Sequence, residues 1–231
     1  MSLYAMSDLH LSHFKEKPMD VFDIRWKNHT QKIYDAWNEI VSEEDTVIVN
    51  GDISWGGKQE EAKPDLDFVH KLKGSKIIFC GNHDYFWNST SRLNELYDNM
   101  LFVKNSFAVY EDYAICGSRG WLCPRDEYYT EHDYKIYKRE VGRLRNSIAM
   151  AVNKGYASDK IIAVTHFPPT NDKKENSDFV EVYKEFGIRR VIYGHLHGAD
   201  KYNTSYQGIV DGIDYTLVSA DYLNFRPVRI M

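Results

Sequence analysis

Polar side chains that can bind metal or transfer protons follow five β-rich runs of the sequence, at the point where each run ends. In layered α/β proteins the loops after the strands converge on a shared crevice, and ligands gather there. We therefore expect the five segments to form one site. They are Tyr4–His10 (YAMSDLH), Val47–Asp52 (VIVNGD), Ile77–Asp84 (IIFCGNHD), Ile162–His166 (IAVTH) and Val191–His197 (VIYGHLH).

Seven residues of these segments are candidate metal ligands through oxygen or imidazole nitrogen atoms: Asp8, His10, Asp52, Asn82, His166, His195 and His197. This donor set suits manganese, iron or zinc and does not suit a structural thiolate zinc site. Seven ligands are too many for one tetrahedral ion with an open position. They suffice for two divalent ions if one carboxylate bridges them, at the separation of about 3.5–4 Å known from two-metal phosphoryl-transfer sites.

Four of the nine histidines lie outside these segments: His13, His29, His70 and His132. We interpret these four as surface or core residues. For His13 an alternative is a place behind the ligands, because metal ligands need neighbours that orient them.

The elements that must position the site alternate between short β-rich runs and amphipathic helices, which predicts an α/β layered fold. One apolar stripe runs through Ile33, Trp37, Ile40 and Val41, and a second through Tyr137, Val141, Leu144, Ile148 and Val152; the spacing of three and four residues predicts a helix for each. Ten strands are predicted: Leu3–Met6, Thr46–Val49, Lys76–Cys80, Leu101–Val103, Ser106–Tyr110, Tyr113–Gly117, Lys160–Thr165, Arg190–Tyr193, Gln207–Val210 and Tyr215–Ser219.

The basic residues around the second stripe predict a solvated helix surface, with an anion-binding face as the alternative. The segment Ser118–Asp133 has weak periodicity, and long loops of this kind are usually functional or mobile. Its aromatic residues Trp121, Tyr128 and Tyr129 pack the loop down or stack on a planar group of a ligand.

Composition places the chain among ordinary folded proteins, with 231 residues, 43% hydrophobic and 27% charged. The net charge of -5 disfavours a nucleic acid polymer or an anionic membrane surface as partner. No apolar stretch reaches the roughly 18 residues of a membrane span, and Cys80, Cys116 and Cys123 form neither a disulfide framework nor a CxxC site. We expect a cytoplasmic protein whose cysteines are small core residues, with one domain over residues 1–231.

The five segments, taken in order, resemble the signature of the calcineurin-like metallophosphoesterases: DxH, GD, GNHD, a later single histidine and GHxH. The resemblance spans Asp8 to His197. It implies an α/β fold of two mixed β-sheets packed face to face and flanked by helices, a four-layer α-β-β-α sandwich with a dinuclear metal site at one edge.

The resemblance also implies a distribution of roles. One metal is held by Asp8, His10, Asp52 and His197, and the other by Asp52, Asn82, His166 and His195, with Asp52 bridging. His83 corresponds to a histidine that assists the leaving group or the phosphoryl oxygens without binding metal, and Asp84 would orient it.

The expected reaction is the attack of a metal-bridging hydroxide on phosphorus, with His83 as the acid. Asp84 would favour the charged form of His83. Arg119, just after the predicted strand Tyr113–Gly117, is the candidate substrate-binding cation because guanidinium binds phosphate in bidentate fashion. A surface salt bridge is the alternative for this arginine.

Departures from better-known relatives narrow the expected substrate. Gly51–Gly57 (GDISWGG) lacks the second aspartate and the arginine of the protein-phosphatase block GDxVDRG. Trp55 and Asp84 stand where purple acid phosphatases have a ligand tyrosine and a glutamate. We therefore expect a phosphohydrolase of a small phosphodiester, nucleotide or phosphomonoester; the alternative is a catalytically inactive, partner-binding scaffold on the same fold. The substrate, the native metal pair and the oligomeric state stay open.

Overall fold

Two β-sheets organise the chain, each in its own compact unit with its own helices. The computed structural model describes residues 1–14, 17–127 and 129–231. Unit 1 comprises Met1–Phe102 and Val218–Met231, and unit 2 comprises Val103–Leu217. Each sheet combines parallel and antiparallel pairs, so the predicted mixed α/β class with two mixed sheets is confirmed. The single domain over residues 1–231 stays a prediction.

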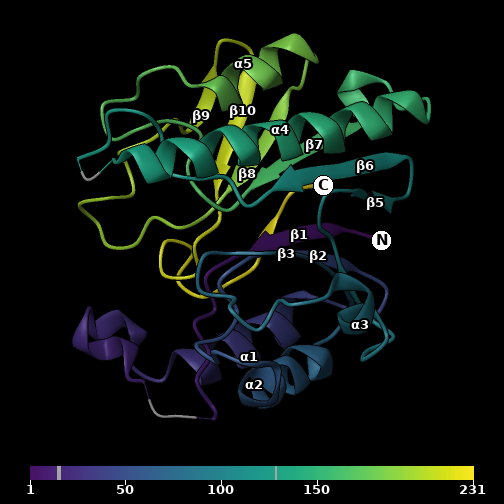
Figure 1. Ribbon diagram of the computed structural model, residues 1–231. Coiled ribbons are helices and arrows are strands. Elements are labelled where there is room, and N and C mark those ends of the chain that lie inside the picture. Colours follow the sequence, from purple (N-terminus) through teal and green to yellow (C-terminus); the bar gives the residue numbers. More distant parts are fainter. Residues whose placement is uncertain (15–16, 128) are drawn as a thin grey trace. The chain divides into compact units, whose positions relative to one another are not determined.

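The sheet of unit 1 has the strand order β11-β1-β2-β3-β4, in which β11 is antiparallel to β1 and the other neighbours are parallel. Parallel neighbours end at the same edge, so the loops after β1, β2 and β3 leave the sheet side by side. Helices α1 and α2 lie on one face of this sheet (Figure 1). The elements are β1 (Leu3–Met6), α1 (His29–Ile40), β2 (Thr46–Asn50), α2 (Gln59–Lys71), β3 (Ser75–Phe79), α3 (Thr90–Asn94), β4 (Met100–Phe102) and β11 (Val228–Arg229), with 3₁₀ turns at Met19–Val21 and Ile24–Trp26.

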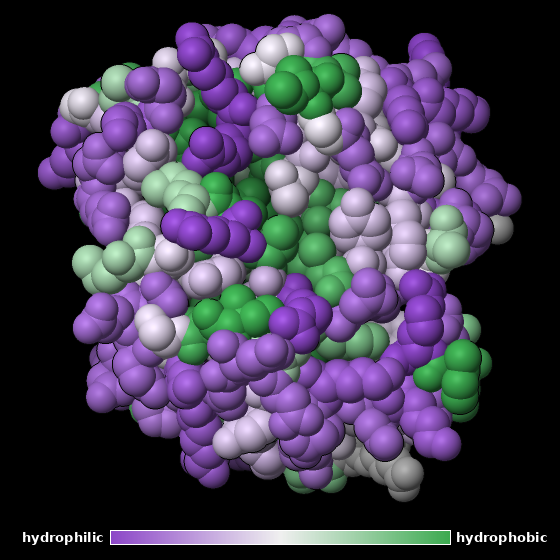
Figure 2. All heavy atoms as spheres, turned by 180° about the vertical axis from the view of Figure 1, so that it is seen from behind, coloured by the Kyte–Doolittle hydropathy of each residue, from purple (hydrophilic) through white to green (hydrophobic). Residues whose placement is uncertain are grey.

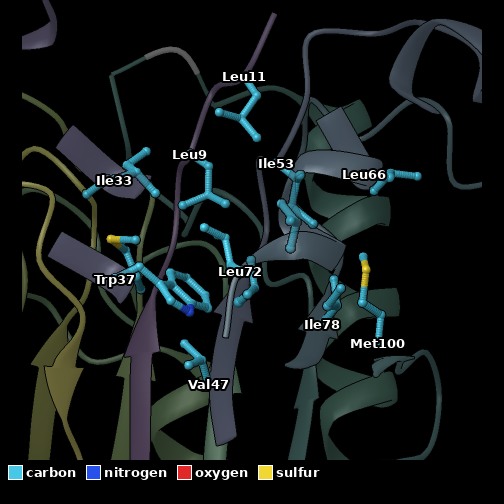
Figure 3. Packing of buried hydrophobic residues seen from close by; sticks show 14 of the residues in the cluster. Leu9, Leu11, Ile33, Trp37, Val47, Ile53, Leu66, Leu72, Ile78 and Met100 are labelled. Atoms are coloured by element: carbon cyan, nitrogen blue, oxygen red, sulfur yellow. The ribbon is translucent and has the colours of Figure 1, made fainter. Parts of the chain in front are cut away.

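A hydrophobic core fixes the sheet of unit 1 against its helices (Figure 3). Ile33 and Trp37 of α1 and Leu66 of α2 are fully buried together with Val47 of β2 and Ile78 of β3. Burial of such side chains stabilises a fold by about 1.5–3 kcal/mol each. The strand ends that carry the candidate ligands therefore emerge from a well-packed layer.

The sheet of unit 2 has the order β5-β6-β7-β8-β10-β9, with antiparallel pairs only at its two edges. The long helix α4 begins in a capping box, in which Thr130 and Asp133 bond each other's backbone N–H groups. Helices α4 and α5 lie on one face of the sheet (Figure 1). The elements are β5 (Phe107–Tyr110), β6 (Tyr113–Ser118), α4 (Glu131–Asn153), β7 (Ile161–Thr165), α5 (Asp178–Glu185), β8 (Arg190–Tyr193), β9 (Gly208–Val210) and β10 (Ile213–Leu217), with a 3₁₀ turn at Ser158–Lys160.

All ten predicted strands are present within a few residues of their expected bounds, and so are both predicted helices. One predicted core position is wrong: Val152 is 41% exposed, and its neighbour Ala151 is buried in its place. Both residues fit the spacing of three and four residues after Ile148, and Ala151 is the one that lies on the buried face. Helices α2 and α5 and the short strand β11 were not among the predicted elements.

The basic side chains of α4 are engaged in ion pairs, as predicted for a solvated surface. Lys138 pairs with Asp178 of α5 at 2.8 Å, and Arg145 pairs with Glu185 at the end of that helix. Arg139 and Arg143 approach the buried carboxylate of Glu140 at 3.3 and 2.6 Å. Two of the cysteines, Cys116 and Cys123, are buried in the core of unit 2, and burial raises the pKa of the Cys116 thiol to about 12.

Hydrophilic side chains cover most of the face of each unit that Figure 2 shows. Within the described ranges, every helix is too short or too polar to span a lipid bilayer.

Candidate metal centre

The backbone is in the left-handed region at four of the seven predicted ligands. The φ angles are 60° at Asp8, 45° at His10, 53° at Asp52 and 70° at His195. Such residues are uncommon outside glycine and cost about 1–3 kcal/mol each, and they cluster where a side chain must be aimed for function. The turns after β1, β2 and β8 are therefore shaped around these side chains.

In unit 1 the loops after β1 and β2 run beside each other and bring three ligands together. The amide of Asp8 donates to Gly51 O at 2.9 Å, and the amide of His10 donates to Asp52 O at 3.0 Å. His10 Nε2 lies 3.9 Å from Asp52 Oδ2, and Asp8 and His10 offer ligand atoms within 4.8 Å of each other. All three side chains are almost completely buried. Buried carboxylates are costly unless they are paired or bind a cation.

Asp84 ties the loop after β3 to the loop after β2. Its carboxylate accepts from the backbone N–H groups of Asp52 (2.9 Å), Ile53 (2.8 Å) and Gly81 (2.8 Å). Gly81 is required there, because a Cβ at this position would overlap the Asp52 carboxylate and backbone nitrogen. Asp84 therefore holds Asp52 in place through the backbone, while its predicted effect on His83 stays a prediction.

His83 lies at the same end of unit 1 and is half-buried. Its amide donates to Asp52 Oδ1 at 2.8 Å, and its ring centroid lies 5.7 Å from that of His10. Asn82 precedes it in the same loop and is also half-buried. The loop after β3 thus brings the predicted acid and a predicted ligand to the Asp52 turn.

Trp55 also belongs to this cluster, although the sequence singled it out only as the residue that replaces the ligand tyrosine of purple acid phosphatases. Its ring stacks on His10 with centroids 4.8 Å apart and lies 4.3 Å from His83. Lys17 Nζ lies 3.0 Å from the Trp55 ring centroid, in cation–π geometry. The position of Trp55, three residues after Asp52, is the sequence signal that could have indicated its place in the site.

Two histidines outside the signature support the same loops. His29 Nε2 lies 3.2 Å from the carbonyl oxygen of His10, and burial lowers the pKa of His29. His13 Nδ1 lies 2.6 Å from Asp65 of α2, whose other oxygen accepts from Ser54 Oγ. The alternative for His13, a place behind the ligands, stays a prediction. Asp65 was missed, although an acidic residue among the buried positions of an amphipathic helix was the available signal.

In unit 2 the ligands follow β7 and β8, which are parallel neighbours. His166 is fully buried, its carbonyl accepts from Gly194 N at 3.0 Å, and its ring centroid lies 5.3 Å from that of His195. His166 and His195 offer ligand atoms within 4.8 Å of each other. His195 and His197 are half-buried. That these imidazoles and the carboxylates of unit 1 bind the same ions stays a prediction.

Arg119 follows β6 and contacts His166 through its backbone. Its carbonyl oxygen accepts from the amides of His166 and Phe167, both at 3.0 Å. Its guanidinium lies 4.4 Å from the Trp121 ring centroid and 3.9 Å from the buried carboxylate of Glu140. The role of Arg119 in binding substrate stays a prediction. The alternative, a salt bridge, corresponds to the contact of Arg119 with Glu140.

The loop after Arg119 is packed down, as one of the two interpretations of its aromatic residues expected. Trp121 Nε1 donates to Asp133 at 2.9 Å, and its ring lies 5.0 Å from Phe167. Tyr129 is half-buried, and burial raises the pKa of its phenol to about 12. Tyr128 lies outside the described residues.

The donor atoms fit hard or borderline divalent ions. They are carboxylate oxygens and imidazole nitrogens, largely shielded from water and aimed by strained turns. Among the residues that the structure describes, no cysteine is part of the two groups of His, Asp and Glu residues suited to a metal. This chemistry matches manganese, iron or zinc better than a thiolate-bound structural ion.

The model of the calcineurin-like phosphoesterases matches residues 1–199, most of the chain. The chain belongs to this family. Its sequence is also similar to the gene 66 proteins of two mycobacterial phages. Identity is 32% over 103 residues for phage D29, covering 43% of this chain and 50% of the relative, and 31% over 80 residues for phage L5, covering 34% and 37%. The matched parts thus span half or less of these relatives.

Solved structures of other proteins share the calcineurin-like fold at low sequence identity. A protein of unknown function from Aquifex aeolicus, AQ665, superposes with a TM-score of 0.55 at 17% identity, covering 99% of this chain and 95% of that one. The phosphopantetheinyl hydrolase PptH from Mycobacterium tuberculosis gives 0.55 at 15% identity, covering 100% and 95%. At these identities the likeness concerns the fold alone.

Proposed function

We propose that this family member is a metal-dependent phosphohydrolase that acts on a small phosphodiester, nucleotide or phosphomonoester. The observation that carries the proposal is the left-handed backbone at Asp8, His10, Asp52 and His195. Strain of this kind persists only where the surrounding structure maintains it, and four of the twelve described non-glycine residues with a positive φ are residues of the family signature. The proposal includes the cytoplasmic location predicted from the sequence.

The proposed ligands are those of the sequence analysis. Asp8, His10, Asp52 and His197 hold one divalent ion, and Asp52, Asn82, His166 and His195 hold the second. The close approach of Asp8 and His10 in unit 1, and of His166 and His195 in unit 2, supports this grouping. Two bound ions would neutralise phosphoryl oxygens and lower the pKa of a water molecule.

The chain itself supplies orientation and a proton. His83 lies beside His10 and Trp55, where its ring can donate a hydrogen bond to the departing oxygen. Asp84 fixes the backbone of Asp52, so that the proposed bridging carboxylate keeps one orientation. Arg119 would supply positive charge after β6; its backbone contacts His166, and its guanidinium lies over the Trp121 ring.

The test is hydrolysis of bis-p-nitrophenyl phosphate and p-nitrophenyl phosphate with added Mn²⁺, compared with protein treated with a chelator. We expect Mn²⁺-dependent turnover of at least one ester. His166→Ala should abolish it, while His132→Ala, a change at the first turn of α4, serves as the matched control. Metal-loaded protein that hydrolyses neither ester would contradict the proposal and favour a partner-binding scaffold.

A further inference from the structure

Unit 2 contains a cavity of about 220 Å³ that borders His195. Its walls come from the loop after β6, the segment after β7 and the segment after β8. The apolar part of the lining is formed by Trp121, Leu122, Phe167 and Leu196. Ligand pockets are concave, mostly apolar and lie next to a few polar groups that fix orientation, and this cavity has those features.

The aromatic wall of the cavity is held in one orientation. Trp121 is fixed by its hydrogen bond to Asp133 and by the guanidinium of Arg119 over its ring. Phe167 is 4% exposed, and its ring centroid lies 4.0 Å from that of His195. Gly120, with φ of 71°, lets the loop approach Phe167, since a Cβ there would lie 3.1 Å from Phe167 Cβ. A rigid wall binds a flat or apolar group at low entropic cost.

The charges of the lining are mainly negative. Asp126, Glu127 and Asp172 contribute carboxylates, and Lys201 contributes an ammonium group. The Asp126 carboxylate accepts from the amides of Cys123 (2.8 Å) and Asp172 (3.3 Å). A second phosphate or a carboxylate on the ligand would therefore meet repulsion in this cavity.

We propose that the cavity binds the alcohol part of the substrate, and that this part carries no negative charge and is mainly apolar or aromatic. The inference rests on the proposed function, because it places the phosphate at the metal ligand His195. The volume is below the roughly 300–1,000 Å³ of pockets for drug-sized ligands. The cavity therefore suits a single ring or a short branched chain and is too small for a dinucleotide.

The first experiment compares esters whose leaving alcohols are chemically similar. Ethyl, benzyl and 4-carboxybenzyl phosphates are offered with Mn²⁺, as monoesters or as methyl diesters, whichever class the protein hydrolyses, and kcat/KM is measured. We expect a preference of about tenfold or more for benzyl over ethyl, as apolar pockets provide. The 4-carboxybenzyl ester should lose most of this preference. Equal values for benzyl and ethyl esters would overturn the inference.

The second experiment fills the cavity. Thr204 lines it, whereas its neighbour Asn203 does not, so Thr204→Trp is compared with Asn203→Trp. Thr204→Trp should remove the benzyl preference, so that the ratio of the kcat/KM values for the benzyl and ethyl esters falls to about one. Asn203→Trp should behave like the unmodified protein. Leu122→Trp fills the cavity from the other wall and decides the matter if Thr204→Trp is poorly folded.

A binding measurement separates the cavity from the hydrolysis. The ¹⁹F line width of 4-fluorobenzyl alcohol is recorded with the unmodified protein, with Thr204→Trp and with Asn203→Trp. Broadening by the unmodified protein and Asn203→Trp, but not by Thr204→Trp, supports the cavity. No broadening, or equal broadening by Thr204→Trp, overturns it. Broadening without hydrolysis of any ester would contradict the proposed function and leave the cavity as a binding site.

Discussion

The two units hold their candidate ligands in different ways. Unit 1 places Asp8, His10 and Asp52 on left-handed turns, and it surrounds them with the bonds of Asp84 and His29. Unit 2 places His166 directly after a strand with its own short backbone bonds, and of its three candidate ligands His195 alone has a positive φ. A cavity in unit 2 borders the candidate ligand His195.

This difference suggests that unit 1 mainly fixes the metal ligands and that unit 2 mainly determines substrate choice. Each left-handed turn costs about 1–3 kcal/mol, so unit 1 gives up stability at three positions to fix oxygen and nitrogen ligands. Unit 2 contributes three imidazoles, of which His195 and His197 are more exposed than Asp8, His10 and Asp52, and His195 borders space that a substrate group can fill. We therefore expect changes in unit 1 to affect metal binding first and changes around the cavity of unit 2 to affect substrate choice first.

The largest effect is expected for Asp52→Asn. The change keeps the shape and one carbonyl oxygen, which can still accept from His83 N. It removes the charge of the proposed bridging ligand, so we expect a loss of about 10³-fold or more in kcat and of one or both metals per chain. Metal content by elemental analysis and turnover of the p-nitrophenyl esters measure both. Asp67→Asn, a similar change on α2, is the control; two metals per chain in Asp52→Asn would refute the bridging role.

The next effect is expected for His83→Gln. The His83 ring lies among aromatic neighbours, and its backbone is not in the left-handed region. The metal content of the variant should therefore stay at two per chain. Loss of a proton donor slows hydrolysis by about 10²–10⁴-fold for esters with poor leaving groups. For p-nitrophenolate, which leaves without protonation, the loss should be much smaller. Equal slowing of both kinds of ester would argue against an acid role.

A smaller effect is expected for Asp84→Asn. The amide keeps one acceptor oxygen for the three backbone N–H groups that the carboxylate now serves. Groups that orient ligands typically contribute 10–100-fold in metal affinity, so activity should fall at limiting Mn²⁺ by about that factor. Saturating Mn²⁺ should restore most of kcat, as it would not for a group that takes part in the reaction. A loss of kcat that no Mn²⁺ concentration repairs would instead place Asp84 in the chemistry with His83.

Much of the fold could be predicted from sequence because its strands are short, apolar and closely followed by glycine or polar residues. The ten strands and the two striped helices follow from these patterns. Helix α2 was missed because it is rich in charge and contains Pro64. Val152 was placed wrongly because the spacing allows either the third or the fourth residue after Ile148, and the pattern alone does not choose between them.

Only part of the candidate site could likewise be predicted from the sequence. The signature residues could be found because they follow strands at fixed spacing. Their supporting residues could not, since His29 and Asp65 lie on helices that only the tertiary fold brings to the loops. The cavity of unit 2 is formed by loops whose course depends on single contacts, such as Trp121 with Asp133.

Unit 1 also contains a buried charge far along its sheet from the ligands, which predicts a pH effect on stability. Lys76 of β3 is 1% exposed, its Nζ donates to the carbonyl of Leu72, and burial lowers its pKa to about 8. The unfolded chain therefore binds more protons between about pH 8 and 10.5, and stability should rise with pH across this window. The gain is about 3 kcal/mol at most.

Urea unfolding at pH 7.5 and 10 measures this gain in the unmodified protein, in Lys76→Met and in the exposed control Lys71→Met. The rise should be absent only from Lys76→Met. The same rise in all three proteins would assign it to other groups.

The smallest effect is expected in unit 2, for a substitution in α4 away from the candidate ligands. It tests whether such a substitution leaves the activity unchanged. Gly142 lies within α4, and nothing lies within 4 Å of a Cβ added there. Gly142→Ala should raise stability by about 0.8–1 kcal/mol, since alanine loses less backbone freedom in a helix. Gly155 is as open but has φ of 96°, so Gly155→Ala should lower stability instead. Thermal unfolding measures both, and unchanged ester hydrolysis in Gly142→Ala is expected, because a helix that only backs the sheet does not set the ligand geometry. A loss of activity in this variant would show that α4 is coupled to the ligands as tightly as the loops of unit 1.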